Sequence, residues 1–384
     1  ILDEVTSERT QNYLTKAKLF LKQGNNFEAI EYLQNTSLIL MSAKPRVLII
    51  YTGGTIGMIN DHLTGELKSF DFDHIYDNVP ELKRLEADLH TISFDRPVDS
   101  SEMNPEMWRT IAQTVFDKYT QYDGFVILHG SDTMAYSASA LSFMLQGLKK
   151  PVIFTGSQLP IGTIRTDGKE NLITAIELAA LRNKSGDAVI QEVAVYFEYS
   201  LFRGNRSSKV SANQFEAFES PNYPKLAVAG VNIVVNYDLL HRTKLETLEL
   251  YATMSNRVAL LKIYPGFPVE AYRSLFDRSS TDAIVLETFG SGNAPSNPAF
   301  QDLISAYIKN GGLIVNITQC SSGSVQQGKY QTSSFFQQIG VVSGKDMTTE
   351  AALTKLMYLL VNTPRHTVTA KAIELSICGE LSED

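Results

Sequence analysis

The stretch Arg46–Met58, RVLIIYTGGTIGM, decides the fold of this chain. It opens with Val47–Ile50, an unbroken run of β-branched and aliphatic residues that is typical of a short strand buried on both faces. The run leads into Gly53-Gly54, and paired glycines let a backbone adopt a positive φ or approach a ligand closely. The next residue is a hydroxyl, Thr55. The stretch therefore predicts a strand and a tight turn that presents a candidate nucleophile.

The glycine turn has two other interpretations. A phosphate-binding loop would need a Lys-Ser or Lys-Thr at the P-loop spacing, and the glycines here do not form GxGxxG. A purely structural turn between strand and helix is the second. However, Thr52–Gly57, TGGTIG, resembles the first signature of the L-asparaginase family, in which the second threonine attacks the amide. This resemblance implies that Thr55 is the nucleophile.

Length and composition limit the function classes. With 384 residues, 43% of them hydrophobic and 20% charged, the chain is long enough for two globular domains. A net charge of −8 without basic runs argues against nucleic acid or an anionic membrane surface as a partner. Only two cysteines occur, and neither a long apolar run nor a signal-peptide pattern is present, so we expect a cytoplasmic protein that acts on a small molecule.

The chain divides into four parts by pattern. Residues 1–43 have helical spacing around a Gly-Asn turn and predict a helical arm. Residues 44–236 alternate strands and helices, which predicts a larger N-terminal α/β domain with a doubly wound, mostly parallel sheet. Residues 237–257 are polar and predict a linker. In residues 258–384 the alternation resumes, which predicts a smaller C-terminal α/β domain.

The predicted strands indicate where the site lies. The main ones are 47–50, 125–129, 151–155, 193–197, 258–263, 283–286 and 313–317, with helices expected at 134–148, 171–181 and 349–360. In open parallel sheets, ligands bind beyond the carboxyl ends of the strands. The loops that follow these strands are therefore the places to search for partners of Thr55.

A second glycine turn follows the strand at 125–129. It reads HGSDTM and presents Ser131 and Asp132 immediately before the predicted helix. Either side chain could simply cap that helix. The turn also resembles the second asparaginase signature, His-Gly-Thr-Asp-Thr, with Ser131 in place of the threonine. Serine keeps the hydroxyl and loses a methyl group, so a proton relay remains possible.

Two further stretches extend the resemblance. Lys209 lies in a polar loop, where a lysine is usually solvated, yet it matches a lysine that type I asparaginases bury beside the second hydroxyl and the aspartate. Asp99-Ser100-Ser101 matches the loop that binds the substrate's α-carboxylate and α-ammonium groups. An Asx or Ser turn before the next helix is its alternative interpretation.

The resemblance covers about residues 46–363 and is closest to the cytoplasmic type I enzymes of bacteria. It implies hydrolysis of L-asparagine in two acyl-transfer steps without metal or cofactor, with Ser131, Asp132 and Lys209 as the relay and backbone amides at the glycine turns as oxyanion donors. Many members carry a tyrosine on the loop after the first signature. In this chain the loop at residues 62–68 contains no tyrosine, and Glu66 is the nearest side chain that aligns with it. Tyr76 follows ten residues after Glu66.

Two other functions share these motifs. One is the glutaminase subunit of a transfer-RNA amidotransferase, which usually has a larger β-rich N-terminal domain, and the other is a catalytically inactive amide-binding sensor.

The resemblance further implies a homo-oligomer, with a dimer of dimers expected, in which Asn293 completes a neighbour's substrate site. It also implies an activating second asparagine held by residues matched as Ser208, Arg273, Thr318 and Cys320. In the alternative interpretation neither residue binds an effector: Arg273 is an exposed helix residue and Cys320 is a small buried apolar residue.

Overall fold

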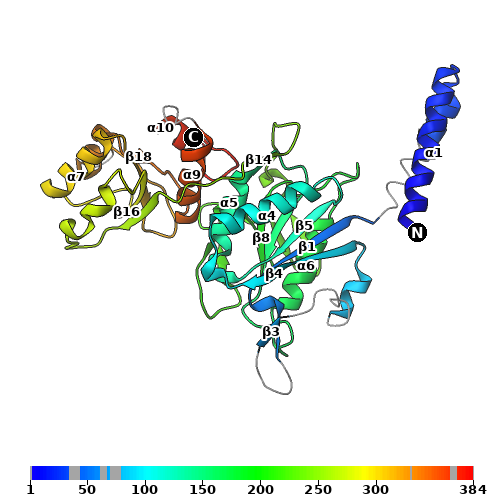
Figure 1. Cartoon of the computed structure of the whole chain (residues 1–384), viewed down its shortest axis with the longest axis horizontal. Helices are drawn as coiled ribbons and strands as arrows, with labels where there is room; N and C mark the ends of the chain where they lie inside the picture. Colours follow the sequence, from blue (N-terminus) through cyan, green and yellow to red (C-terminus); the bar gives the residue numbers. More distant parts are fainter. Residues whose placement is uncertain are drawn as a thin grey trace.

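A computed structural model describes residues 2–33, 44–60, 67–69, 79–328, 331–363 and 370–383 (Figure 1). At the N-terminus, α1 (Leu2–Lys22) and a second helix at 26–33 form a hairpin around Gly24. Tyr32 of the second helix lies 5.4 Å from the Tyr13 ring and 5.5 Å from the Phe20 ring, measured between ring centroids. The helices predicted for the arm are confirmed.

An eight-stranded sheet forms the larger domain. Its strands, in spatial order, are β13 (Ile233–Val235), β12 (Ala227–Ala229), β9 (Ser200–Arg203), β8 (Val193–Phe197), β7 (Val152–Thr155), β5 (Gly124–Leu128), β1 (Arg46–Gly53) and β4 (Asp88–Val98). The strands from β8 to β4 pair in parallel, whereas β9, β12 and β13 pair antiparallel. The predicted doubly wound, mostly parallel sheet is confirmed.

Strand β1 is buried on both faces because its side chains alternate between two cores. Leu48 and Ile50 belong to the core that contains residues of α4 (Pro105–Lys118) and α5 (Met134–Met144). Val47 and Ile49 belong to the core on the opposite face, with α6 (Gly168–Ala180). The continuous apolar run in the sequence therefore has a direct structural cause.

The smaller domain holds a four-stranded parallel sheet of β15 (Val258–Lys262), β16 (Ala283–Thr288), β17 (Leu313–Thr318) and β18 (Val342–Ser343). Its other elements are η8 (Val269–Phe276), α7 (Pro298–Lys309), α8 (Gln331–Ile339), α9 (Thr349–Asn362) and α10 (Ala370–Glu374). The predicted second α/β domain is confirmed.

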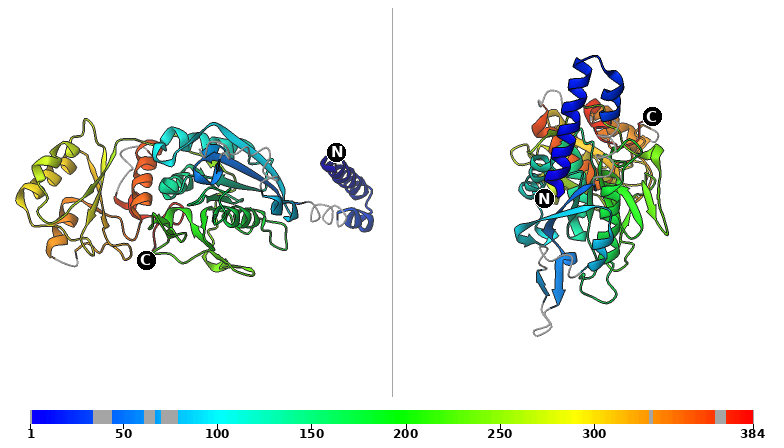
Figure 2. Two further views of the ribbon diagram at one scale, coloured as in Figure 1. Left: turned by 90° about the horizontal axis from the view of Figure 1, so that it is seen from below. Right: turned by 90° about the vertical axis from the view of Figure 1, so that its right-hand side faces the viewer.

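Helix α9 packs between the two sheets, as Figures 1 and 2 show. Its side chains Leu356 and Leu359 share one buried core with Phe143 of α5 and Val285 of β16. The two domains thus meet through a common hydrophobic core.

Short elements complete the chain. They are β2 (Met58–Asn60), β3 (Leu67–Ser69), β6 (Leu145–Gln146), β10 (Ser208–Lys209), β11 (Phe218–Glu219), β14 (Glu249–Leu250), η1 (Thr55–Gly57), η3 (Pro80–Arg84), η4 (Ser100–Glu102), η5 (Ser131–Thr133), η6 (Gly204–Arg206) and η7 (Tyr237–Leu239). Strand β6 replaces the end of the helix predicted to reach residue 148, because it pairs with β14 from the predicted linker. Within the described part of the chain, no helix is long and apolar enough to cross a membrane.

Candidate active site

The glycine turn after β1 packs directly against its neighbours. Gly53 and Gly54 have φ values of 136° and 87°, which favour glycine. A Cβ atom at Gly53 would lie 2.1 Å from the carbonyl oxygen of Val98, and one at Gly54 would lie 2.4 Å from the backbone nitrogen of Gly130. The absence of side chains here brings the ends of β1, β4 and β5 together.

Thr55 follows this turn as the first residue of η1 and is partly exposed. Its carbonyl accepts a hydrogen bond from the Met58 backbone. Among the described residues, none hydrogen-bonds the Thr55 hydroxyl. The residues 61–66 and 70–78, with the candidates Glu66 and Tyr76, lie outside the described chain.

Ser131, Asp132 and Lys209 form one hydrogen-bonded group. Lys209 Nζ donates to Ser131 Oγ at 2.8 Å and to Asp132 Oδ1 at 2.6 Å. The Lys209 side chain is only 14% exposed, whereas that of Asp132 is 69% exposed. Neither Ser131 nor Asp132 caps a helix, since η5 and α5 begin without a side-chain cap. The capping interpretation is therefore wrong, and the lysine is not a solvated one.

Gln158 is a member of this group that sequence reasoning missed. Its Oε1 accepts a hydrogen bond from Ser131 Oγ at 3.3 Å, and its Nε2 donates to the Gln214 carbonyl at 3.0 Å. The Asp167 carboxylate accepts from the Gln158 backbone at 2.8 Å, so it holds the loop in place. Gln158 follows the carboxyl end of β7, and the same edge rule that pointed to Ser131 could have found it.

Buried His129 supports the second glycine turn from beneath. Its Nδ1 lies 2.7 Å from the Gly130 carbonyl and its Nε2 lies 2.9 Å from Ser137 Oγ. Burial lowers the pKa of His129 to about 4. The imidazole is therefore neutral near neutral pH, with Nδ1 as the donor and Nε2 as the acceptor.

The Asp99 loop forms the Asx turn that was one of its two interpretations from the sequence. Asp99 Oδ1 accepts from the backbone and the hydroxyl of Ser101, each at 2.9 Å, which is an Asx turn and holds the pKa of Asp99 below its ordinary value. Ser100 is only 3% exposed, and a Cβ atom at Gly130 would lie 2.6 Å from its hydroxyl. The turn thus places Ser100 against the loop that carries Ser131.

The remaining candidates contact residues outside this group. Asn293 forms a β-bridge with Phe289 after β16, and its backbone donates a hydrogen bond to the Phe289 carbonyl at 2.8 Å. Ser208 donates to Glu350 Oε2 of α9 at 2.9 Å. Burial raises the pKa of Glu350, and the hydrogen bond from Ser208 acts in the opposite direction.

The residues matched to an effector site make separate local contacts in the single chain. Arg273 is exposed and pairs with Glu270 through contacts of 2.8 and 2.6 Å. Thr318 Oγ1 accepts from the backbone of exposed Cys320 at 3.0 Å. No hydrogen bond or ion pair among the described residues links Arg273 with Ser208 or Thr318. The same part of the chain holds no group of three or more His, Cys, Asp or Glu side chains suited to a metal.

Comparison with known proteins places this geometry in a family. Residues 46–241 match the family model described as asparaginase, N-terminal, and residues 257–372 match the glutaminase/asparaginase C-terminal domain. L-asparaginase 1 of Escherichia coli K12 is 41% identical over 352 residues, which cover 89% of this chain and 99% of that protein. The 60 kDa lysophospholipase of Mus musculus is 40% identical, covering 83% of this chain and 59% of that protein.

A solved structure agrees with this assignment. L-asparaginase I from Vibrio cholerae superposes with a TM-score of 0.80 at 39% identity, covering 89% of this chain and 100% of that one. Two family models and these relatives span both domains and all the glycine turns that form the site. This chain therefore belongs to the asparaginase family.

Proposed function

We propose that this chain hydrolyses L-asparagine to L-aspartate and ammonia through an acyl-enzyme on Thr55. The observation that carries the proposal is the contact of Lys209 with both Ser131 and Asp132, beside the turn that presents Thr55. The 41% identity to an L-asparaginase supports the substrate.

The reaction follows from the positions of these groups. Thr55 Oγ attacks the side-chain carbonyl carbon of asparagine, and its proton passes through the group of Ser131 and Lys209 to the departing nitrogen, so that ammonia leaves. Water then attacks the carbonyl carbon of the ester, the bond from that carbon to Thr55 Oγ breaks, and a proton from this water passes through the same group to Thr55 Oγ as aspartate leaves. Backbone amides at the two glycine turns stabilise the oxyanion in each step.

Substrate binding is proposed for the loop of Asp99, Ser100 and Ser101 together with Asp132. The Asx turn uses Oδ1 of Asp99, so its second oxygen remains to accept a hydrogen bond from the substrate's ammonium group. Ser100 lies beside the second glycine turn and helps to orient the α-carboxylate. An asparagine bound in this way would direct its side-chain amide toward Thr55.

Ammonia release by the purified chain alone tests the proposal. We expect release from L-asparagine without any partner. Release from glutamine only in the presence of an amidotransferase would indicate the ammonia-donating subunit instead. Asparagine binding in calorimetry without turnover would indicate the inactive sensor.

We further propose a homo-oligomer, arranged as a dimer of dimers, in which Asn293 of one chain completes the substrate site of another. Membership of the asparaginase family and the prevalence of closed symmetric assemblies among soluble oligomers support this arrangement. Light scattering at nanomolar concentration should report the oligomer, and a fully active monomer would contradict it.

A second asparagine bound through Ser208, Arg273, Thr318 and Cys320 is proposed as an activator. Ser208 is the neighbour of Lys209 and is bonded to Glu350 of α9, which gives a short physical route between the second site and the catalytic group.

We also propose a cytoplasmic location, which the two free cysteines support.

A further inference from the structure

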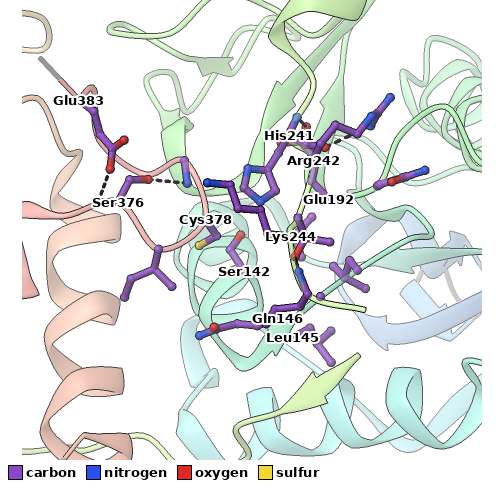
Figure 3. A pocket seen from close by; sticks show the side chains of 18 residues that line it. Ser142, Leu145, Gln146, Glu192, His241, Arg242, Lys244, Ser376, Cys378 and Glu383 are labelled. Atoms are coloured by element: carbon purple, nitrogen blue, oxygen red, sulfur yellow. Dashed lines mark hydrogen bonds between the residues drawn. The ribbon is translucent and has the colours of Figure 1, made fainter. Parts of the chain in front are cut away.

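A cavity of about 530 Å³ lies away from all the residues proposed for catalysis. Four segments surround it: the end of α5 with β6, the residues before β8, the stretch 241–245, and the C-terminal stretch 376–383 (Figure 3). A volume of this size is typical of sites that enclose a small organic ligand.

The inner wall of the cavity is apolar or electrically neutralised. Leu145, Leu148 and Val193 are buried apolar residues that line it. The Glu192 carboxylate also lines it, but Arg203 Nε donates to one oxygen at 2.7 Å and the backbone of His241 donates to the other at 2.7 Å. Glu192 therefore adds no free negative charge.

The outer wall carries positive charge. Lys244 and Arg242 are exposed lining residues, and in Figure 3 the Lys244 side chain extends toward the C-terminal stretch beside His241. Among the described residues, Arg242 donates to two carbonyls, those of His241 and Val189. In the described ranges, no carboxylate lies within 4.0 Å of either cation. The remaining acidic lining residue, Glu383, accepts from the Ser376 backbone.

We propose that this cavity binds a small organic anion whose carboxylate or phosphate head is held by Lys244 and Arg242, with a short apolar body against the inner wall. The two cations at the mouth favour a ligand with an anionic head, because that head gains charge-assisted hydrogen bonds from Lys244 and Arg242. The apolar inner wall favours a ligand with an apolar body, because the body is removed from water there. The positive mouth contrasts with the net charge of −8 on the whole chain. The site is independent of the proposed asparagine hydrolysis.

Calorimetry with matched probes tests the charge requirement. Octanoate and octyl phosphate should bind, and whichever binds more tightly identifies the head group. Octanol, which lacks the charge, and acetate, which lacks the body, should bind at least about tenfold more weakly. Equal affinity for octanol, or no binding of either anion at millimolar concentration, would overturn the proposal.

Charge-reversal variants locate the binding. Lys244→Glu and Arg242→Glu should each raise the dissociation constant about tenfold or more. Both residues are exposed, so folding should be kept. Lys309→Glu on α7 makes the same change in net charge in the other domain and should leave binding unchanged. Affinity that is equal in all three variants would refute this location.

Discussion

Lys209 Nζ lies 2.8 Å from Ser131 Oγ, although the two residues are 78 positions apart in the chain. Lys209 reaches this position because β10 pairs with β11, with Lys209 opposite Phe218, which belongs to the buried core. The glycine turn at Gly130 presents Ser131 from the end of β5. The pairing of β10 with β11 and the parallel sheet thus bring together the two side chains of the proposed proton-transfer group.

Thr55→Ala should lower the rate of asparagine hydrolysis at least about hundredfold, because it removes the proposed nucleophile. Folding should persist, since the glycines determine the turn. Ammonia release and circular dichroism are the measurements. Thr114→Ala, at a partly exposed position of α4, is the control and should keep full activity. A Thr55→Ala enzyme with more than about a hundredth of the rate would move the nucleophile to Ser131.

Ser131→Thr should be tolerated, because threonine keeps the hydroxyl that accepts from Lys209 and donates to Gln158. Ser131→Ala removes that hydroxyl and should lower the rate by about a hundredfold or more, as expected for the loss of a proton-transfer group. Steady-state kinetics of both variants is the measurement. A folded but inactive Ser131→Thr enzyme would show that the relay is assigned incorrectly.

The rate of asparagine hydrolysis should depend sigmoidally on asparagine concentration, and Arg273→Ala should reduce the sigmoidicity. A coupling free energy of about 1–3 kcal/mol between the two sites is the usual range. Arg109→Ala is the control, because Arg109 forms the same kind of exposed pair with Glu106 on α4. A hyperbolic curve in wild type that Arg273→Ala leaves unchanged would exclude the effector site.

His129 should make the unfolding free energy depend on pH. Burial lowers its pKa from 6.5 to about 4, so between these values the unfolded chain binds a proton that the folded chain does not. The stability that neutral His129 contributes is therefore present above pH 6.5 and is lost as the pH falls toward 4.

Urea unfolding across this pH range measures the effect. His129→Gln should show a shallower loss of stability on acidification than wild type. Phe154→Leu changes the ring that packs on His129 with a centroid distance of 5.7 Å, so it should lower stability at every pH but keep the wild-type slope. An unchanged slope in His129→Gln would mean that other groups cause the acid sensitivity.

Glu380→Gln should cost about 3–5 kcal/mol in the free energy of unfolding, because it leaves the Lys355 ammonium buried without its ion-pair partner. Lys355 Nζ lies 2.7 Å from Glu380 Oε1, with side chains 1% and 0% exposed. Burial alone would raise the pKa of Glu380, but Lys355 holds it below its ordinary value. Denaturant unfolding measures the loss. The exposed control Glu81→Gln should change stability by about 0.5 kcal/mol at most.

The sequence by itself determined the strand β1, the two glycine turns and the hydroxyls that they present. These features are local: an unbroken apolar run requires burial on both faces, and a glycine pair permits a turn that other residues resist. The order of strands and helices was likewise sufficient to predict two parallel sheets. Thr55, Ser131 and Asp132 could be proposed because each follows directly from such a turn.

The tertiary structure decided which side chains meet. Gln158 bonds to Ser131 across 27 positions, and α9 joins the cores of both domains. Strand ends could mark Gln158 as a candidate, but its bond to Ser131 depends on β7 lying beside β5, and the position of α9 depends on its packing against two sheets (Figure 1). The same holds for Ser208, which donates to Glu350 of α9 across 142 positions. Contacts between distant segments depend on the geometry of the whole chain, which no single stretch encodes.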